Sequence, residues 1–589
     1  MSDTVPAGTG GDDPGGNGLG PAEAARPVIA VFSGPTATIG NSPPLVTSNQ
    51  ARARHGLPVH PGRFDVLRAQ RLAAPVTVYI AAHSAHPLEG DAAELYAPPD
   101  GWLGTDGTFV PYDAAAAPTA EGTPVYTATL SPEDGLYLLP YMARQADGSA
   151  WDDATAEPFA PRERSRQTFY PDASRIYEEI DRFGIDGQGF ASSLSTVASF
   201  RFFRAAPSGG YTKGLPAAAR TDEGTGDIPP ETLGEDYWIY FPYHLRAEPH
   251  LITLARATNL VQRVLRDGAG TFAGAQWLEG SPTTEETMYW LGLLIDTTVP
   301  LVGHSAQRPH QSTSADGDRN IVDGVKYLLS GIALDETGTD RVGAVMIVDE
   351  VVFAAREITK TDARPGNYEA TGGHGGIVAD MGGYGPPKLT YLPTRLHTHR
   401  SEVNLTKLPD EVAGVTGRLA AGGVVGTRVR VKDAAGELLA SAMPQVSIAK
   451  YGRYMPVDSR TDPGLDHEVT ARIEANLAGA ALAGFVGEGA SPYGLMNQTT
   501  DNALTVAIYC GYPVVKVGRG NTGGMAYHME PQFIVGDNLT STKARMLLMA
   551  ALLKLGALPP AADPFHPTEA ETAATLAAVA AYQSLFDTH

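Results

Sequence analysis

The sequence has a single cysteine, Cys510, among its 589 residues. One cysteine excludes an intrachain disulfide and a metal cluster held by thiolates. Cys510 ends the apolar run that starts at Ala507, and free cysteine is among the most buried residue types. We therefore predict a buried, inert thiol. Sparse cysteine suits a reducing compartment, and we expect the protein to be cytoplasmic.

Long apolar runs and positive charge are also scarce. No uninterrupted apolar stretch of ~18 residues is present to span a membrane. The Gly-, Pro- and Asp-rich head lacks the basic start and apolar run of a secretory signal, and we expect residues 1–26 to be a disordered tail. Lysine and arginine total 44 against 66 acidic residues, a net charge of −22. That balance disfavours nucleic acid and anionic membranes as partners.

Ordered structure is expected to begin at the apolar run Pro27–Phe32, which predicts a buried strand. A glycine-bearing turn follows, and such turns are where open α/β sheets place ligands. Residues 51–235 differ, because short strand-like runs such as Pro75–Ile80 and Gly135–Pro140 alternate there with Pro- and Gly-rich turns. That pattern indicates a β-rich unit with one helix near Ser174–Phe183.

From about residue 250 the pattern alternates between helix and strand. Leu251–Leu265 has apolar residues at helical spacing, and the helical stretch Ile321–Leu329 separates strand-like runs at Val299–Val302 and Val342–Val348. Such alternation predicts βαβ units and a mainly parallel sheet. Beyond a boundary near 385–400 a second α/β set follows, comprising Ala480–Val486, Thr505–Tyr509, Pro513–Val517, the helix Ser541–Leu555 with Lys543 and Arg545 on its polar side, and the helix Thr568–Phe586.

The predicted fold class is therefore α/β, with two α/β domains, the N-terminal one interrupted by a β-rich insertion. The predicted boundaries are a tail at 1–26, an N-terminal domain at 27–50 and 236–390, an insertion at 51–235, and a C-terminal domain at 391–589.

Three segments far apart in the chain share one resemblance. Ser33–Thr36 is similar to the Thr-Gly-Gly-Thr opening of L-asparaginases, and Gly280–Thr287 is similar to their Gly-Thr-Asp-Thr-x-Glu-Glu-Thr motif. Ala355–Thr361, which follows Asp349-Glu350, is close to their Ala-Arg-x-Val-Thr-Lys-Thr segment. Further stretches in the same order also fit: Ser314–Gly317, Gly487–Ala490 and Gly536–Leu539. The chain thus resembles the bacterial L-asparaginase/glutaminase family, whose two α/β domains it is expected to share.

The resemblance implies a catalytic set of two hydroxyls and a lysine: Thr36, Ser281 and Lys360. Amide hydrolysis needs a nucleophile, a base that takes its proton, and donors for the oxyanion. Lysine can be that base if burial lowers its pKa. We expect Lys360 to activate Ser281 and backbone N–H groups near Gly34 or Gly280 to hold the oxyanion. Which hydroxyl attacks first stays open.

Pro282 departs from the family pattern. The family has an aspartate there, which orients the lysine and grips the α-amino group of the substrate. Proline offers neither a carboxylate nor a backbone N–H. Lys360 would then lack its usual partner unless another acid such as Glu279 supplies it. We expect free asparagine to bind badly and the true substrate to carry no α-ammonium at this position.

The segment that binds the substrate's α-carboxylate in the family aligns loosely with residues 243–248. Its serine is missing, and Arg246 is the candidate to hold a carboxylate by a bidentate contact.

Several motifs also have a purely structural interpretation. Thr283 with Glu286 three residues later has the pattern of a helix capping box, and Asp316 could cap the helix from Ile321. The run His397–His399 has no acidic cluster beside it, which favours a solvated loop over a metal site.

The sequence predicts a hydrolase of a carbon–nitrogen amide bond, linear or in a lactam or imide, that needs neither metal nor other cofactor. The partner is a small-molecule amide, with no nucleic acid or membrane, and the resemblance implies a homo-oligomer, a dimer or tetramer. Two rival hypotheses remain. One is a true L-asparaginase in which another acid replaces the lost aspartate, and the other is a non-catalytic binding protein that kept the fold.

Overall fold

The computed structural model describes most of the chain beyond residue 250 and isolated stretches before it. The described residues are 26–34, 46–47, 65–71, 76–81, 100–103, 108–111, 123–130, 136–140, 166–167, 177, 180, 194–204, 251–308, 314, 316–361, 368–371, 375–382, 385–452, 464–520, 524 and 530–589.

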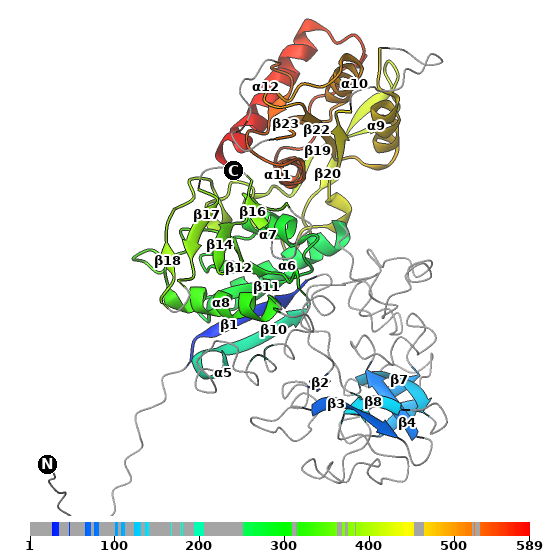
Figure 1. The fold of residues 1–589 in the computed structure, drawn as a ribbon. Helices are drawn as coiled ribbons and strands as arrows, with labels where there is room; N and C mark the ends of the chain where they lie inside the picture. Colours follow the sequence, from blue (N-terminus) through cyan, green and yellow to red (C-terminus); the bar gives the residue numbers. More distant parts are fainter. Residues whose placement is uncertain are drawn as a thin grey trace, which may run out of the picture.

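An eight-stranded mixed sheet organises the first part of the molecule (Figure 1). Its first five strands are parallel, and the last three run antiparallel to their neighbours. In spatial order the strands are β10 (Ser199–Arg204), β1 (Val28–Ser33), β11 (Phe272–Leu278), β12 (Leu301–His304), β13 (Val345–Val348), β14 (Val351–Ala354), β17 (Ile377–Asp380) and β18 (Lys388–Leu389).

Both faces of this sheet are buried. In β1, Ile29 and Val31 belong to one core cluster, whereas Ala30 and Phe32 belong to another. Because side chains alternate across a strand, the two clusters lie on opposite faces, as expected for an α/β sheet with helices on both sides. The helices of this part are α5 (Leu194–Val197), α6 (Leu251–Asp267), α7 (Thr284–Leu294) and α8 (Gly317–Ser330). We call β1, β10–β14, β17, β18 and these helices the large-sheet region.

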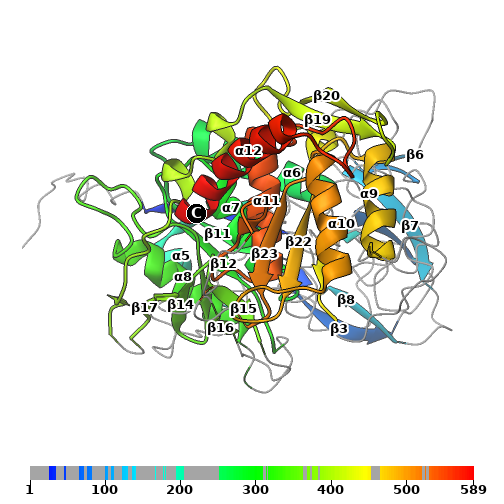
Figure 2. The ribbon, with the colours of Figure 1, turned by 90° about the horizontal axis from the view of Figure 1, so that it is seen from above.

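A parallel four-stranded sheet organises the last part of the chain, which we call the small-sheet region (residues 411–589). Its strands are β21 (Gln445–Lys450), β22 (Ala483–Gly489), β23 (Val514–Gly518) and β24 (Ile534–Val535), preceded by the hairpin β19 (Glu411–Gly417) and β20 (Val424–Arg430). Its helices are α9 (His467–Gly479), α10 (Gln498–Tyr509), α11 (Ser541–Leu555) and α12 (Glu569–Thr588), with α12 lying alongside α11 in Figure 2.

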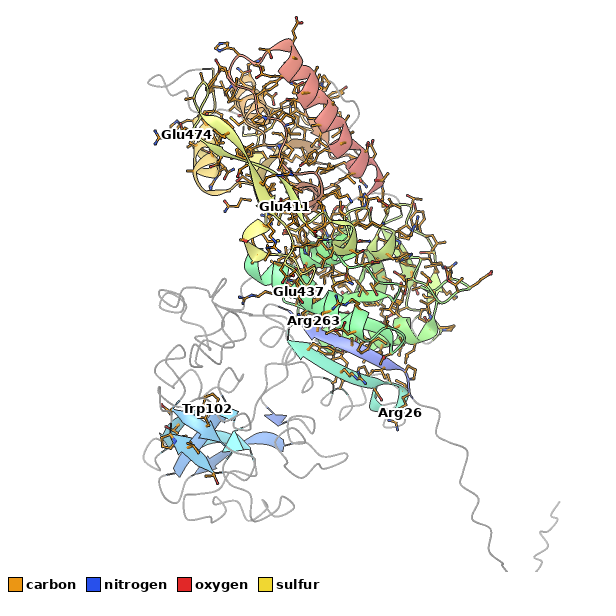
Figure 3. The ribbon with its side chains drawn as sticks, turned by 180° about the vertical axis from the view of Figure 1, so that it is seen from behind. Arg26, Trp102, Arg263, Glu411, Glu437 and Glu474 are labelled. Atoms are coloured by element: carbon orange, nitrogen blue, oxygen red, sulfur yellow. The ribbon has the colours of Figure 1, made fainter. Side chains whose placement is uncertain are left out.

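The two regions contact each other through α6 and α7. Helix α11 packs against α7, and the Asn259 side chain exchanges hydrogen bonds of 2.9 and 2.8 Å with the backbone of Leu438. Beside this contact, Arg263 of α6 pairs with Glu437, and both are labelled in Figure 3.

Two smaller sheets lie in the part of the chain between β1 and β10. They are a five-stranded sheet, β6-β5-β7-β4-β9, and a three-stranded sheet, β2-β3-β8. Their strands are β2 (Val46–Thr47), β3 (Asp65–Arg71), β4 (Val76–Ala81), β5 (Gly101–Leu103), β6 (Phe109–Pro111), β7 (Thr123–Leu130), β8 (Leu136–Pro140) and β9 (Arg166–Gln167). Within the described residues, no helix is long and apolar enough to cross a membrane.

Most of the predicted elements are confirmed. The strands expected at Pro27–Phe32, Pro75–Ile80 and Gly135–Pro140 are β1, β4 and β8. The predicted helices correspond to α6, α8, α11 and α12, and Gly556 ends α11 with a positive φ of 78°. Cys510 is buried, and burial raises the pKa of its thiol to about 12. The helix expected near Ser174–Phe183 lies largely outside the described residues.

Candidate active site

The motif at Gly280–Thr287 forms a tight turn between β11 and α7. The backbone N–H of Thr283 donates to the carbonyl of Gly280 at 3.3 Å, and the Thr284 hydroxyl donates to the same carbonyl at 2.7 Å. These bonds close the turn just before α7 begins and place Ser281 and Pro282 at its tip. Pro282 is exposed, and Ser281 is half-buried.

Lys360 reaches Ser281 from a second element. It ends β15 (Ile358–Lys360), which pairs with β16 (Tyr368–Ala370). Its Nζ donates to Oγ of Ser281 at 3.0 Å, although the two residues are 79 positions apart. The sequence prediction that these residues form a pair is therefore matched by their geometry.

Tyr368 fixes the backbone of the same serine. Its hydroxyl donates to the carbonyl oxygen of Ser281 at 3.0 Å and lies 3.2 Å from Oγ of Ser305. Burial raises the pKa of Tyr368, so the hydroxyl stays a donor at physiological pH. No local sequence pattern indicates Tyr368, because only the pairing of β16 with β15 brings it beside Lys360.

Among the described residues, the acid that contacts Lys360 is Glu285 rather than Glu279. The backbone N–H of Lys360 donates to Oε2 of Glu285 at 2.5 Å. Burial raises the pKa of Glu285, while the charges of Lys543 and Lys360 act in the opposite direction. In the described part of the chain, no carboxylate lies within ion-pair distance of the Lys360 ammonium.

Glu279 therefore does not take the place of the family aspartate, contrary to the alternative raised above. Its carboxylate is fully buried and accepts hydrogen bonds from the Trp277 indole at 2.7 Å, the Thr283 hydroxyl at 2.6 Å and the Thr287 hydroxyl at 3.1 Å. Burial raises the pKa of Glu279 to about 7, and these three donors oppose that rise. Glu279 thus holds β11 and the first turn of α7 together from inside.

The other predicted site residues are placed only in part. Thr36 and Arg246 lie outside the described residues. The N–H of Gly34 donates to the carbonyl of Leu278 at 2.7 Å, so it is not available to hold an oxyanion. An oxyanion donor in this turn would have to be the N–H of a residue next to Gly34. A Cβ at Gly34 would lie 2.5 Å from the Trp277 ring, which explains the glycine. The N–H of Gly280 has no acceptor among the described residues, which leaves it available as a donor.

Both predicted helix caps are wrong in their hydrogen bonds. Thr283 and Asp316 occupy the N-cap positions of α7 and α8, but neither side chain makes the capping bond. The Thr283 hydroxyl is turned to Glu279, and Glu286 pairs with Arg545 at 2.6 Å. The carboxylate of Asp316 accepts the backbone N–H groups of residues 307 and 308 instead. Tertiary partners have displaced the local ones.

Two predictions of solvent exposure are also wrong. Lys543 is 1% exposed rather than on a polar helix face, and its Nζ donates to the carbonyls of Glu285 and Ala355. Burial lowers the pKa of Lys543 to about 8. The expected solvated loop at His397–His399 contains a buried His397, whose pKa burial lowers to about 4.

Residues 243–368 match the family model described as "Asparaginase, N-terminal". This segment of the chain is similar to the N-terminal domain of asparaginases. It contains the Ser281 turn, Lys360 and Tyr368, so the Ser281–Lys360 pair lies inside the segment that carries the similarity.

Individual relatives match at low identity. The chain is similar to a glutaminase-asparaginase from Acinetobacter glutaminasificans, 28% identical over 171 residues, which cover 28% of this chain and 47% of that protein. L-asparaginase 2 of Escherichia coli (strain K12) is 25% identical over 280 residues, which cover 46% of this chain and 64% of that protein. The chain thus spans about half to two thirds of the length of these relatives.

A crystal structure of a probable cytoplasmic L-asparaginase from Campylobacter jejuni matches with a TM-score of 0.40 and 19% sequence identity, covering 57% of this chain and 86% of that one.

Proposed function

We propose that the protein is an amidohydrolase that cleaves a carbon–nitrogen amide bond, with Ser281 as nucleophile and Lys360 as its base. The observation that supports this most directly is the distance of 3.0 Å between Nζ of Lys360 and Oγ of Ser281. A nucleophile and base within hydrogen-bonding reach, with the base held by a third group, are the signature of covalent catalysis. Here the third group is Glu285, through the backbone of Lys360.

The proposed reaction has two steps. The neutral amine of Lys360 takes the Ser281 proton as Oγ forms a bond to the amide carbon, and the carbonyl oxygen becomes an oxyanion. Collapse of this intermediate breaks the C–N bond, and the leaving nitrogen receives the proton from Lys360. Water then hydrolyses the Ser281 ester, releasing a carboxylic acid. The N–H of Gly280 is the candidate oxyanion donor, because no described residue accepts from it.

Thr36 stays a second candidate for the first attack, since the family resemblance implies two hydroxyls. Arg246 stays the candidate to hold a substrate carboxylate.

The proposed substrate is an amide, lactam or imide without an α-ammonium beside the scissile carbonyl. Pro282 stands exposed at the tip of the turn, one residue from the nucleophile, and contributes no charge. A substrate ammonium placed there would find no counter-charge at position 282. A true L-asparaginase is the second candidate, because several relatives are named L-asparaginases and because Glu285 lies near Lys360.

The domain division and oligomer are parts of the same proposal. We infer that the large-sheet and small-sheet regions correspond to the two α/β domains of the family and that the insertion expected at residues 51–235 ends before α5 and β10. The pairing of β1 with β10 supports this earlier end, because it makes residues 199–204 a strand of the large sheet rather than a part of the insertion. A homodimer or tetramer, and a cytoplasmic location, remain expectations carried by the family resemblance.

The test is release of ammonia or ring opening across asparagine, glutamine, N-blocked amides, lactams and cyclic imides. Ser281→Ala and Lys360→Ala should abolish turnover. Ser584→Ala on α12 and Lys388→Ala on β18, which change an exposed serine and an exposed lysine, are matched controls and should leave turnover unchanged.

Each outcome separates the candidates. Turnover of an amide without a free α-amino group, with free asparagine inert, supports the proposal. Efficient turnover of asparagine supports the second candidate. Turnover that survives Ser281→Ala contradicts the assignment of Ser281 as nucleophile and favours Thr36 in that role. No turnover of any compound by the folded wild type favours the non-catalytic alternative.

A further inference from the structure

A buried lysine of the small-sheet region reaches the segments that carry Ser281 and Lys360. Lys543 lies in the first turn of α11 and is 1% exposed. Its Nζ donates to the backbone carbonyls of Glu285 and Ala355, the latter at 2.5 Å. Lysine is almost never fully buried unless it is paired, because removing an ammonium from water is costly. The burial of this cation between the two regions therefore calls for a reason.

The two carbonyls belong to the two segments that hold the Ser281–Lys360 pair. Glu285 lies in the first turn of α7, just after the Ser281 turn. Ala355 lies between β14 and β15, and β15 ends at Lys360. One ammonium thus joins the segment of the proposed nucleophile to the segment of its base, so both regions contribute to the arrangement of the pair.

The Glu285 carboxylate extends this contact to Lys360 itself. Glu285 is 8% exposed, and its Oε2 accepts the backbone N–H of Lys360 at 2.5 Å. Burial raises the pKa of Glu285, and the charge of Lys543 is the strongest influence that lowers it. The ammonium of Lys543 therefore favours the ionised carboxylate, which is a stronger hydrogen-bond acceptor than the neutral acid.

Glu285 also differs from the other acids near Lys543 in its partners. Three glutamates act on the charge of Lys543, at positions 285, 286 and 357. Arginines pair with Glu286 at 2.6 Å and with Glu357 at 2.8 Å, whereas the described residues offer Glu285 no arginine within ion-pair distance. Lys543 is therefore the main counter-charge of Glu285.

We propose that Lys543 is a positioning residue for the Ser281–Lys360 pair and that it acts through Glu285. It keeps the Glu285 carboxylate charged, and this carboxylate holds the backbone of Lys360 where Nζ lies 3.0 Å from Oγ of Ser281. Lys543 donates to neither member of the pair, so its effect passes through other groups. The inference rests on the proposed function in one respect, that Ser281 is the nucleophile and Lys360 its base.

The test measures how fast Ser281 reacts with a fluorophosphonate, a probe of activated serine hydroxyls that requires no knowledge of the substrate. Oγ forms a bond to phosphorus, fluoride leaves, and Lys360 takes the serine proton. Intact-mass spectrometry follows the labelling, and Ser281→Ala protein gives the background. Where the substrate panel yields an amide that is cleaved, kcat and KM are measured on the same variants.

A double-mutant cycle combines Lys543→Met with Glu285→Gln. Lys543→Met should slow labelling of the folded protein by about tenfold, and lower kcat to the same extent at unchanged KM, within the range of coupling between residues of one network. In Glu285→Gln protein, where no carboxylate remains to be kept charged, the same substitution should slow labelling by less than about threefold. If Lys543→Met does not fold, Lys543→Gln takes its place, because glutamine loses the charge but keeps a donor.

Lys554→Met is the matched control. Lys554 lies on the same helix, is half-buried, and donates from Nζ to the backbone carbonyl of Lys407 at 2.6 Å. The substitution removes a lysine–carbonyl bond of the same kind away from the pair, so it should leave the labelling rate unchanged. Circular dichroism verifies that each variant is folded.

The outcomes separate this inference from the proposed function. Equal falls in the two backgrounds would show a lysine that serves packing alone and would overturn the proposal. A folded Lys543→Met protein that is labelled at the wild-type rate also overturns it. Absence of Ser281 labelling in the wild type overturns it together with the assignment of the nucleophile. The expected coupling in a protein that hydrolyses no amide of the panel supports the positioning role and contradicts only the proposed amide hydrolysis.

Discussion

Two lysines on different strands, Lys516 and Lys360, have opposite electrostatic surroundings. Lys516 of β23 is paired with Asp501 at 2.9 Å and with Glu530, and it lies 4.0 Å from the centre of the Phe533 ring. Lys360 of β15 donates to a serine hydroxyl, and the described residues place no carboxylate within ion-pair distance of its Nζ. Two carboxylates therefore neutralise the charge of Lys516, whereas the described residues offer no such partner to Lys360.

This difference distinguishes a structural lysine from a chemical one. A buried ammonium with two carboxylates is satisfied, so removing it leaves buried negative charge behind. A lysine within hydrogen-bonding distance of a serine hydroxyl has instead the arrangement of a base beside its nucleophile. The comparison makes opposite predictions for the same substitution at the two positions.

The largest expected effects come from Lys360→Met and Lys516→Met. Lys360→Met should lower turnover of the best amide in the panel by about 10³-fold or more, because it removes the base, and should change the free energy of unfolding by less than about 1 kcal/mol. Lys516→Met should lower that free energy by about 3 kcal/mol, because Asp501 and Glu530 lose their cation. Steady-state kinetics and urea unfolding measure the two effects.

Turnover of folded Lys516→Met should stay close to that of the wild type. The comparison fails if the two substitutions have the same profile, with stability and turnover lost together in both.

The next effect concerns the pH dependence of stability. Burial raises the pKa of Glu279 from 4.5 to about 7, so the folded state binds the proton more tightly than the unfolded state. Its contribution to stability is therefore full below pH 4.5 and is lost as the pH rises to about 7. In Glu279→Gln, the free energy of unfolding should decrease by up to about 3 kcal/mol less than in the wild type as the pH rises from 4.5 to 8. Urea unfolding at several pH values measures this difference.

Asp340→Asn is the control for that experiment. Burial also raises the pKa of Asp340 to about 7, so the substitution should flatten the stability profile in the same direction. It should do so without changing turnover. A wild-type profile that does not fall between pH 4.5 and pH 7 would contradict the assigned direction for both acids.

A smaller effect is expected from Tyr368→Phe. The substitution leaves the Ser281 carbonyl without its donor, which should lower the free energy of unfolding by about 1 kcal/mol and kcat by about three- to tenfold at unchanged KM. Tyr582→Phe is the matched control, because the Tyr582 hydroxyl donates to the carbonyl of Gly556 inside the small-sheet region. Tyr582→Phe should lower the free energy of unfolding to a similar extent and leave kcat unchanged. Equal losses of kcat in the two variants would contradict a positioning role for Tyr368.

The smallest effect compares two Thr-x-x-Glu sequences. Thr568 and Glu571 form a capping box at the start of α12, so Thr568→Ala should lower the free energy of unfolding by about 1 kcal/mol at every pH. Thr283 donates to Glu279 instead, so Thr283→Ala should raise the pKa of Glu279 further and steepen the fall of stability with pH. Identical pH profiles for the two variants would contradict this distinction.

Local patterns predicted elements and motifs well. Helical spacing in Leu251–Leu265 and the glycine stop at Gly556 were sufficient to place α6 and the end of α11, because both signals act within a few residues. The motif order likewise predicted that Ser281 and Lys360 belong to one site. What local patterns missed is the choice of partner, as with Tyr368, which reaches Ser281 only through the pairing of β15 with β16.

The sequence by itself determined the α/β class and the family resemblance, since both depend on residue types at short spacing, and the resemblance in turn predicted the pairing of Ser281 with Lys360. The tertiary structure alone decided which acid faces which group, that Lys543 is buried, and that Thr568 caps a helix whereas Thr283 does not. The physical reason is that a polar side chain bonds to the best partner within about 3 Å, and packing brings partners from distant segments that local sequence does not reveal.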